Sequence, residues 1–219
     1  MVDMRATGTV KTPGRGTSDG GQTNIRGTRD GVLFTASYYE SLAMQGRIQV
    51  VNNGSVTTPL TFLVTAANRP DAWLRVPDGT AIIPITVTVA LEAFAGTVTE
   101  IDLRIAQNDI GNGTSSAATV GPLGTRTDVP FTSGVTARQL ATGDTTAETN
   151  PISLWRRTIP AASAAGNDGA SGITITREMM GYPIIVGAST IELFIAATTT
   201  QATGFVVWTF AEIPETDLV

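Results

Sequence analysis

Apolar and polar residues alternate with a period of two along much of the chain, which is the pattern of half-buried β-strands. The clearest alternation covers residues 82–91, 97–106 and 190–197. In the second stretch the residues of the apolar face and then of the polar face are Ile101, Leu103, Ile105 and Glu100, Asp102, Arg104. Nine or ten short strands at this spacing predict an all-β fold, an antiparallel β-sandwich.

Turn residues and breakers separate the predicted strands. Asn53-Gly54 and Pro77-Asp78-Gly79 are typical turn sequences, because glycine supplies a positive φ and proline presets a negative one. Pro84 lies inside an alternating stretch, so we expect an edge position or a bulge there. Helical segments are expected to be short, at residues 39–45 and as one turn at 135–140.

Residues 1–31 differ in amino-acid composition from the rest of the chain. They are rich in Gly, Thr and Arg and contain almost no large apolar side chain, so they cannot bury enough surface to fold alone. We therefore expect an extended N-terminal arm over residues 1–31. A single β-sandwich domain is expected over residues 32–219, with a loop-rich insertion at about 107–170.

The arm carries a small positive charge. Its five basic residues against three aspartates give +2, which leaves −7 for the rest of a chain whose net charge is −5. Two interpretations stay open, a floppy tail or an arm that becomes ordered along a neighbouring subunit. Under the second interpretation the candidate contact residues are Arg5, Lys11, Arg15, Arg26 and Arg29.

The composition excludes several kinds of catalysis. The chain has no His and no Cys, so it contains no Ser-His-Asp triad, no Cys-His pair and no Cys/His zinc or haem site. Glu100 and Asp102 on one strand face could act as a pair of acids, as in glycosidases. Only 6% of the residues are aromatic, however, and cross-strand ion pairs on a solvated or interface face explain the two acids more simply. We expect no enzyme activity, no catalytic residues, no metal site and no cofactor.

Two short motifs have structural explanations. Residues 109–113 and 167–169 resemble fragments of calcium loops, but they lack the spacing and the closing acid of an EF-hand. Asx and glycine turns account for both. The glycines at 14, 16, 20 and 21 have neither a strand before them nor a helix after them, as a phosphate-binding loop requires.

Surface charge is scarce and almost all of its basic part is arginine. Only 15% of the residues are charged, and Lys11 is the single lysine among 14 basic residues. The densest cationic position outside the arm is Trp155-Arg156-Arg157, either an interface anchor or an ordinary exposed doublet beside a strand. The acidic balance argues against direct nucleic-acid contact. No apolar run is long enough to cross a bilayer, so no membrane partner is expected.

The Gly/Arg/Thr arm, the cysteine-free Thr/Val/Ile strands and the lack of a secretory signal in residues 1–10 together resemble viral jelly-roll structural proteins. Bacteriophage capsid, head-decoration and head-fibre proteins share this combination of features. The resemblance covers the whole chain and includes no diagnostic motif. It implies an eight-stranded double sheet, oligomerisation about a symmetry axis and function through contacts.

These observations predict a structural protein of a virion, a capsid or capsid-decoration protein, located in the virion and assembled in the host cytoplasm. The expected partners are copies of the same chain, as a trimer or a larger symmetric assembly, and other virion proteins. The weakly charged arm favours a decoration or cement position over the genome-contacting shell. The alternative is a receptor- or carbohydrate-binding β-sandwich module of a tail fibre or a cell-surface adhesin.

Overall fold

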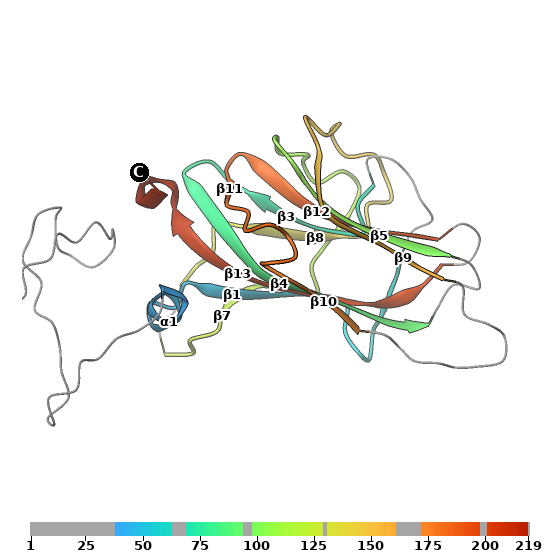
Figure 1. Cartoon of the computed structure of the whole chain (residues 1–219), viewed down its shortest axis with the longest axis horizontal. Coiled ribbons are helices and arrows are strands. Elements are labelled where there is room, and N and C mark those ends of the chain that lie inside the picture. The colour runs from blue at the N-terminus through green and yellow to red at the C-terminus, as the bar shows by residue number, and fades with distance from the viewer. Residues whose placement is uncertain are drawn as a thin grey trace, which may run out of the picture.

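The computed structural model describes residues 38–62, 69–93, 98–128, 131–160, 172–197 and 201–218. These residues form two antiparallel β-sheets that lie face to face as a sandwich (Figure 1), as the alternating pattern predicts. Within this part of the chain no helix is long and apolar enough to span a membrane.

One sheet has seven strands in the order β10-β4-β13-β1-β7, with β11 paired to β4 and β2 paired to β13. Its strands are β1 (Ile48–Asn53), β2 (Leu60–Thr61), β4 (Thr80–Ala93), β7 (Val120–Gly124), β10 (Gly172–Thr176), β11 (Ile185–Val186) and β13 (Thr203–Pro214). The second sheet has six strands in the order β6-β8-β3-β12-β5-β9. Its strands are β3 (Ala72–Val76), β5 (Thr99–Ala106), β6 (Ser116–Ala117), β8 (Thr136–Gln139), β9 (Ile152–Ile159) and β12 (Ser189–Ala197).

The strand order is that of a jelly roll. Eight of the strands, taken in chain order, pair first with last, second with seventh, third with sixth and fourth with fifth. These four pairs are β1 with β13, β3 with β12, β4 with β10, and β5 with β9. Such nested pairing is what a long antiparallel hairpin produces when it rolls into two sheets.

The core lies between the sheets and follows from the alternation. On β5 the side chains of Ile101 and Leu103 are buried in it, and on β12 those of Ile191 and Leu193 lie beside them. Trp208 of β13 contributes the largest side chain from the opposite sheet. Burying apolar surface at about 25 cal/mol per Å² makes this shared face the main source of stability.

Helix α1 (Tyr38–Met44) covers part of the outer face of the seven-stranded sheet (Figure 1). Its buried Leu42 packs with Ile48, Ile83 and Ile213 in a second apolar cluster. The helix ends before Gly46, whose φ of 73° is the left-handed conformation that commonly closes a helix. The short helix expected at residues 39–45 is therefore confirmed.

Pro84 lies in a bulge and not on an edge strand. β4 runs between β10 and β13, and its register with β13 shifts between Thr209 and Phe210, opposite Pro84. On the other side β10 pairs with β4 only from Thr86 onward, while β11 pairs at Ala81 and Ile82. Proline is tolerated there because no ladder partner needs its missing N–H.

Two further expectations about the segment between β5 and β9 are corrected by the structure. The helical turn expected at residues 135–140 is strand β8, because Val135 and Ala137 alternate into the core and β8 pairs with β3. Residues 107–127 are not all loop, since they contain β6 and β7. These short strands lack alternating apolar residues. They are held by backbone pairing, β6 with β8 and β7 with β1.

Two pieces of this segment lie on the outer face of the six-stranded sheet. Residues 107–115 and 141–150, which we call the flap, are joined to each other by hydrogen bonds, including Gln107 N–H to the Thr149 carbonyl (2.9 Å) and Thr146 N–H to the Ile110 carbonyl (2.8 Å). Ile110 of the flap is fully buried against Trp73 of β3 in a small third cluster. Part of the outer face of this sheet is therefore covered by its own chain.

Candidate functional site

The three predicted contact residues of the folded part, Trp155, Arg156 and Arg157, lie on β9. This strand is the outermost of its sheet, and among the described strands it pairs with β5 alone. Of its eight residues only Ile159 is buried. The structure therefore places all three residues on a strand edge that no other described strand pairs.

The three side chains have different environments. Trp155 is half-buried and packs against the core, so it anchors the strand. Arg156 is 63% exposed and its Nη2 lies 2.7 Å from Oδ2 of Asp102. Arg157 is exposed and makes no hydrogen bond, ion pair or ring contact through its side chain with the described residues, whereas every other arginine among them has such a partner.

The other predicted contact residues lie outside the described residues. They are Arg5, Lys11, Arg15, Arg26 and Arg29. Their role in contacts stays a prediction.

Asp102 connects β9 to the charged groups on the outer face of the sheet. Its carboxylate accepts hydrogen bonds from Arg156 Nη2 (2.7 Å) and Ser153 Oγ (2.5 Å), and Arg104 Nη2 lies 3.1 Å away. Burial alone would raise the pKa of Asp102, but these hydrogen bonds and the charge of Arg104 outweigh it and lower the pKa. The cross-strand ion pairs expected for this face are present, although Asp102 is buried and not solvated.

Arg104 extends the charged cluster from β5 to the flap. Its Nη1 donates to both carboxylate oxygens of Glu148, at 3.0 and 3.1 Å, and its guanidinium lies 4.0 Å from the centre of the Phe194 ring. Glu148 belongs to the flap, and its side chain is only 7% exposed. One arginine therefore joins two acids and an aromatic ring from three separate segments.

Glu192 of β12 is the least expected member of this cluster. It is 0% exposed and lies opposite Arg104 on β5 and Trp73 on β3. Burial, reinforced by the nearby charge of Glu148, raises its pKa from 4.5 to about 8 despite the opposing effect of Arg104. At neutral pH this side chain is therefore mostly protonated.

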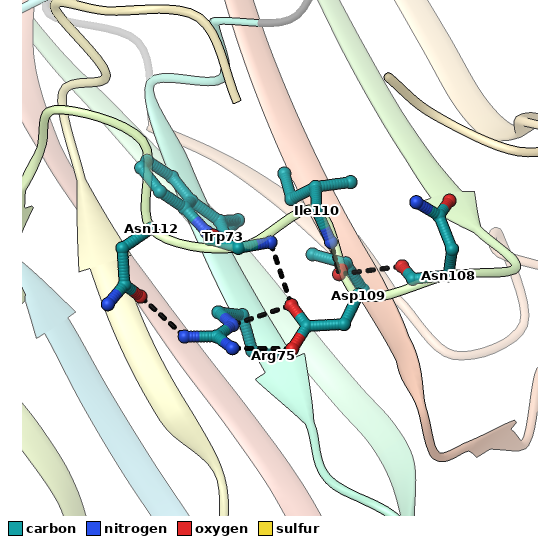
Figure 2. Close-up of polar contacts among 8 residues, drawn as sticks. Trp73, Arg75, Asn108, Asp109, Ile110 and Asn112 are labelled. Atoms are coloured by element: carbon teal, nitrogen blue, oxygen red, sulfur yellow. Dashed lines mark hydrogen bonds and ion pairs between the residues drawn. The ribbon is translucent and has the colours of Figure 1, made fainter. Parts of the chain in front are cut away.

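A second polar cluster holds the other end of the flap (Figure 2). Arg75 of β3 donates to both carboxylate oxygens of Asp109, and its Nη1 donates to Asn112 Oδ1 at 2.5 Å. The Gly111 N–H donates to Asp109 Oδ1 at 2.8 Å, which forms an Asx turn. The hydrogen bonds from Arg75 lower the pKa of Asp109. The resemblance of residues 109–113 to a calcium loop thus reflects a turn anchored by an arginine.

The chemistry available in the described residues is that of charge pairing. Glu100 is exposed, whereas Asp102 is neutralised by two arginines, so the two acids do not form a catalytic pair. No group of three or more acids, among the residues described, is placed to hold a metal ion. An open pocket of about 340 Å³ beside β11 is lined by aliphatic and small side chains with Gln107 and Ser189, none of them ionisable.

Sequence analysis did not identify Glu148 and Glu192 as members of the site. Glu192 occupies a polar position in the alternation of β12, which indicates its face but not that another segment covers that face. Glu148 lies in a polar stretch without periodicity. Only the path of the flap brings the two together.

No protein-family model matches the chain, and no curated protein matches it. Among solved structures, the crystal structure of the infectious bursal disease virus VP2 subviral particle is similar over 90% of this chain and 48% of that chain, with 13% identity and a TM-score of 0.17. The chain thus spans about half the length of the solved chain. A likeness at this level supports no conclusion about function, so function has to be inferred from the topology and the contacts described above.

Proposed function

We propose that this chain is a structural protein of a virion, a capsid or capsid-decoration protein, that functions by associating with copies of itself and with other virion proteins. The observation that carries the proposal is the open edge of β9, where Arg157 has no partner among the described residues. Catalysis is not part of the proposal.

An unpaired strand edge is a template for another chain, and proteins usually shorten it, cover it or charge it. β9 is eight residues long and has Arg156 and Arg157 near its middle. Two such edges would repel each other, because like charges placed opposite on neighbouring strands are destabilising. The favoured partner is therefore an acidic surface.

The chain itself supplies an acidic surface. Its net charge is −5, and exposed acids such as Asp78, Glu92 and Glu215 have no ion pair among the described residues. Contact between a basic edge on one copy and an acidic surface on the next is head-to-tail, and such contacts form a ring when the rotation between copies closes. The proposed assembly is such a closed ring, a trimer or a larger symmetric species in the virion, put together in the host cytoplasm.

The arm over residues 1–31 is proposed to add to these contacts. With a charge of only +2 it favours a decoration or cement position over a shell that contacts the genome. Deleting residues 1–31 is expected to weaken assembly and to leave the β-sheet circular dichroism unchanged.

Light scattering on the full chain, over a range of concentrations at low salt, tests the proposal. We expect a trimer or a larger species, and Arg157→Glu should shift the association midpoint at least tenfold toward higher concentration. Arg126→Glu makes the same charge change just after β7, at the opposite edge of the seven-stranded sheet, and should leave the midpoint nearly unchanged. A protein that is monomeric at every concentration, or equal effects of both variants, would contradict the proposal.

One observation favours a carbohydrate- or receptor-binding module as the second candidate. Tyr182 is 57% exposed with a φ of 59°, and the Arg177 guanidinium lies 5.2 Å from its ring centre and 5.4 Å from that of Tyr39. A strained, exposed aromatic residue beside an arginine is typical of binding surfaces. A glycan array that gives saturable binding, lost in Tyr182→Ala, would favour this candidate. Trp155 is a weaker target, because it is half-buried against the core.

A further inference from the structure

The junction between the flap and the six-stranded sheet contains two buried carboxyl groups, both beside Arg104. Glu192 is on the sheet and Glu148 is on the flap, and neither side chain is more than 7% exposed. Both carboxyl oxygens of Glu192 are buried, and no donor among the described residues reaches them. Buried polar atoms normally have partners, so these two oxygens require an explanation.

A proton is the simplest partner. Two carboxylates can only accept hydrogen bonds, but a protonated carboxyl group can donate one to its neighbour. Glu148 already accepts both hydrogen bonds from Arg104, so the shared proton is best placed on Glu192. This placement also avoids a second negative charge in a buried position.

We propose that Glu148 and Glu192 form a binding site for one proton, and that this proton holds the flap on the sheet. When the proton is present, the pair is joined by a hydrogen bond and the flap is closed. When it is lost, two negative charges lie side by side in a low-dielectric position and the flap is released.

The charged groups around the pair do not compensate for a second negative charge. On β5, Arg104 is already shared between Glu148 and Asp102, and its Nε is buried without a partner in the described residues. On β3, the neighbour of Glu192 is the neutral Trp73. The other charged groups nearby are engaged elsewhere: Arg75 with Asp109, Arg156 with Asp102, Arg69 with Asp144, and Asp71 with the Ile195 N–H.

The flap is suited to move as a unit. Its two segments are bonded to each other by backbone hydrogen bonds. Besides the Arg75 and Arg104 contacts, three hydrogen bonds hold its first segment to β12 and β3: Ile110 N–H to Thr190 Oγ1 (3.3 Å), Thr190 Oγ1 to the Asn108 carbonyl (3.1 Å) and Trp73 Nε1 to the Gly111 carbonyl (3.3 Å). Arg138 of β8 also donates to the Ser115 carbonyl (2.6 Å), Ala141 N–H donates to the Pro70 carbonyl (3.2 Å), and Arg69 pairs with Asp144 (2.7 Å). Loss of the carboxyl hydrogen bond therefore weakens the attachment at the Glu148 end of the flap.

The sign of the pH dependence follows from proton linkage. The pKa of Glu192 is about 8 in the closed form, and it should return toward 4.5 once the flap opens and water reaches the group. The open form then binds fewer protons between these two values, so the opening equilibrium constant should rise by up to tenfold per pH unit from about pH 5 to about pH 8. Above pH 8 it should level off.

Hydrogen–deuterium exchange on the full chain, followed by mass spectrometry, tests the proposal. Exchange rates of peptides covering residues 107–115 and 141–150 are divided by the rate of unprotected amides at each pH. Peptides from β4 and β13 serve as internal references for global unfolding. We expect flap opening in the unmodified chain to increase more than tenfold between pH 5.5 and 8, with little change in the references.

Two variants separate the proton from other causes. Glu192→Gln replaces the carboxyl group with an amide that cannot titrate but can still donate a hydrogen bond. In this variant we expect flap opening to change less than twofold per pH unit. Glu148→Gln removes the other charge and leaves Glu192 buried, so it should reduce the slope less than Glu192→Gln does; a reduced slope in this variant decides the question if the first variant does not fold. Glu212→Gln alters a buried glutamate that already accepts hydrogen bonds from Ser133 and Gly134, and it should keep the unmodified slope. A flat profile in the unmodified chain, or an unchanged slope in both Glu192→Gln and Glu148→Gln, would overturn the proposal.

Discussion

Trp208 Nε1 donates a buried hydrogen bond to Asn53 Oδ1 at 2.8 Å, between two neighbouring strands of the seven-stranded sheet. Asn53 ends β1 in one sheet, and its Nδ2 donates to the carbonyl of Arg138 in the other sheet at 3.1 Å. Both Asn53 and Trp208 are at most 1% exposed. The largest side chain of the seven-stranded sheet is thus tied through one amide to β8, across the end of the sandwich.

Replacing Asn53 should therefore be costly. Asn53→Ala leaves the Trp208 indole N–H and the Arg138 carbonyl without their partner, so we expect a loss of about 2–4 kcal/mol in the free energy of unfolding. The neighbouring Asn52 is half-buried and makes no side-chain hydrogen bond with the described residues, so Asn52→Ala should cost less than about 1 kcal/mol. Urea unfolding of the two variants gives the comparison, and equal losses would contradict this role for Asn53.

Gly204 is required by close backbone packing. A Cβ atom at this position would lie 2.0 Å from the carbonyl oxygen of Ala90 on the neighbouring β4. Backbone cannot move aside as a side chain can, so Gly204→Ala should destabilise the protein by about 3 kcal/mol or more. Gly172 on β10 has nothing within 4 Å of its Cβ position, and Gly172→Ala should change the melting temperature little. A melting temperature for Gly204→Ala within 2 °C of the unmodified chain, a change of at most roughly 0.5–1 kcal/mol for a chain of this size, would show that the β4 backbone moves aside.

The strands with strict alternation could be predicted from the sequence, and the reason is physical. On β5 and β12 every second residue enters the common core, so period two is imposed by burial on one face. β6 and β7 have no such face and could not be found this way, because backbone pairing with β8 and β1 holds them. Around the short β8 only two residues, Val135 and Ala137, point into the core. Two inward residues are too few for the sequence pattern to distinguish a strand from a helical turn.

The charged cluster shows a second limit. The polar face of β5 was identifiable from Asp102 and Arg104, and so was the basic doublet Arg156-Arg157, but not the position of β9 at the edge of its sheet. That Asp102 and Glu192 are buried depends on the flap, whose polar sequence has no periodicity that would place it over the sheet. Alternation assigns a residue to a face, whereas only tertiary structure shows whether that face is covered.

Asp102 should make the protein sensitive to acid. Its pKa is lowered in the folded chain by hydrogen bonds from Arg156 and Ser153 and by the charge of Arg104, which together outweigh burial. The unfolded chain therefore binds more protons near and below pH 3.8, the ordinary pKa of aspartate. The stability that Asp102 contributes is present above that pH and is lost as the pH falls through the lower pKa of the folded state.

Asp102→Asn tests this dependence, because it keeps the shape of the side chain and removes its charge. At neutral pH we expect a loss of about 1–3 kcal/mol, since hydrogen bonds to charged groups contribute about that much. Between pH 4 and pH 2 the stability of this variant should fall less steeply than that of the unmodified chain. Asp78→Asn, in an exposed turn without an ion pair among the described residues, should retain the steep fall. Urea unfolding midpoints measured at half-unit pH steps would show the two slopes, and parallel curves for Asp102→Asn and the unmodified chain would rule out this carboxylate as a source of acid sensitivity.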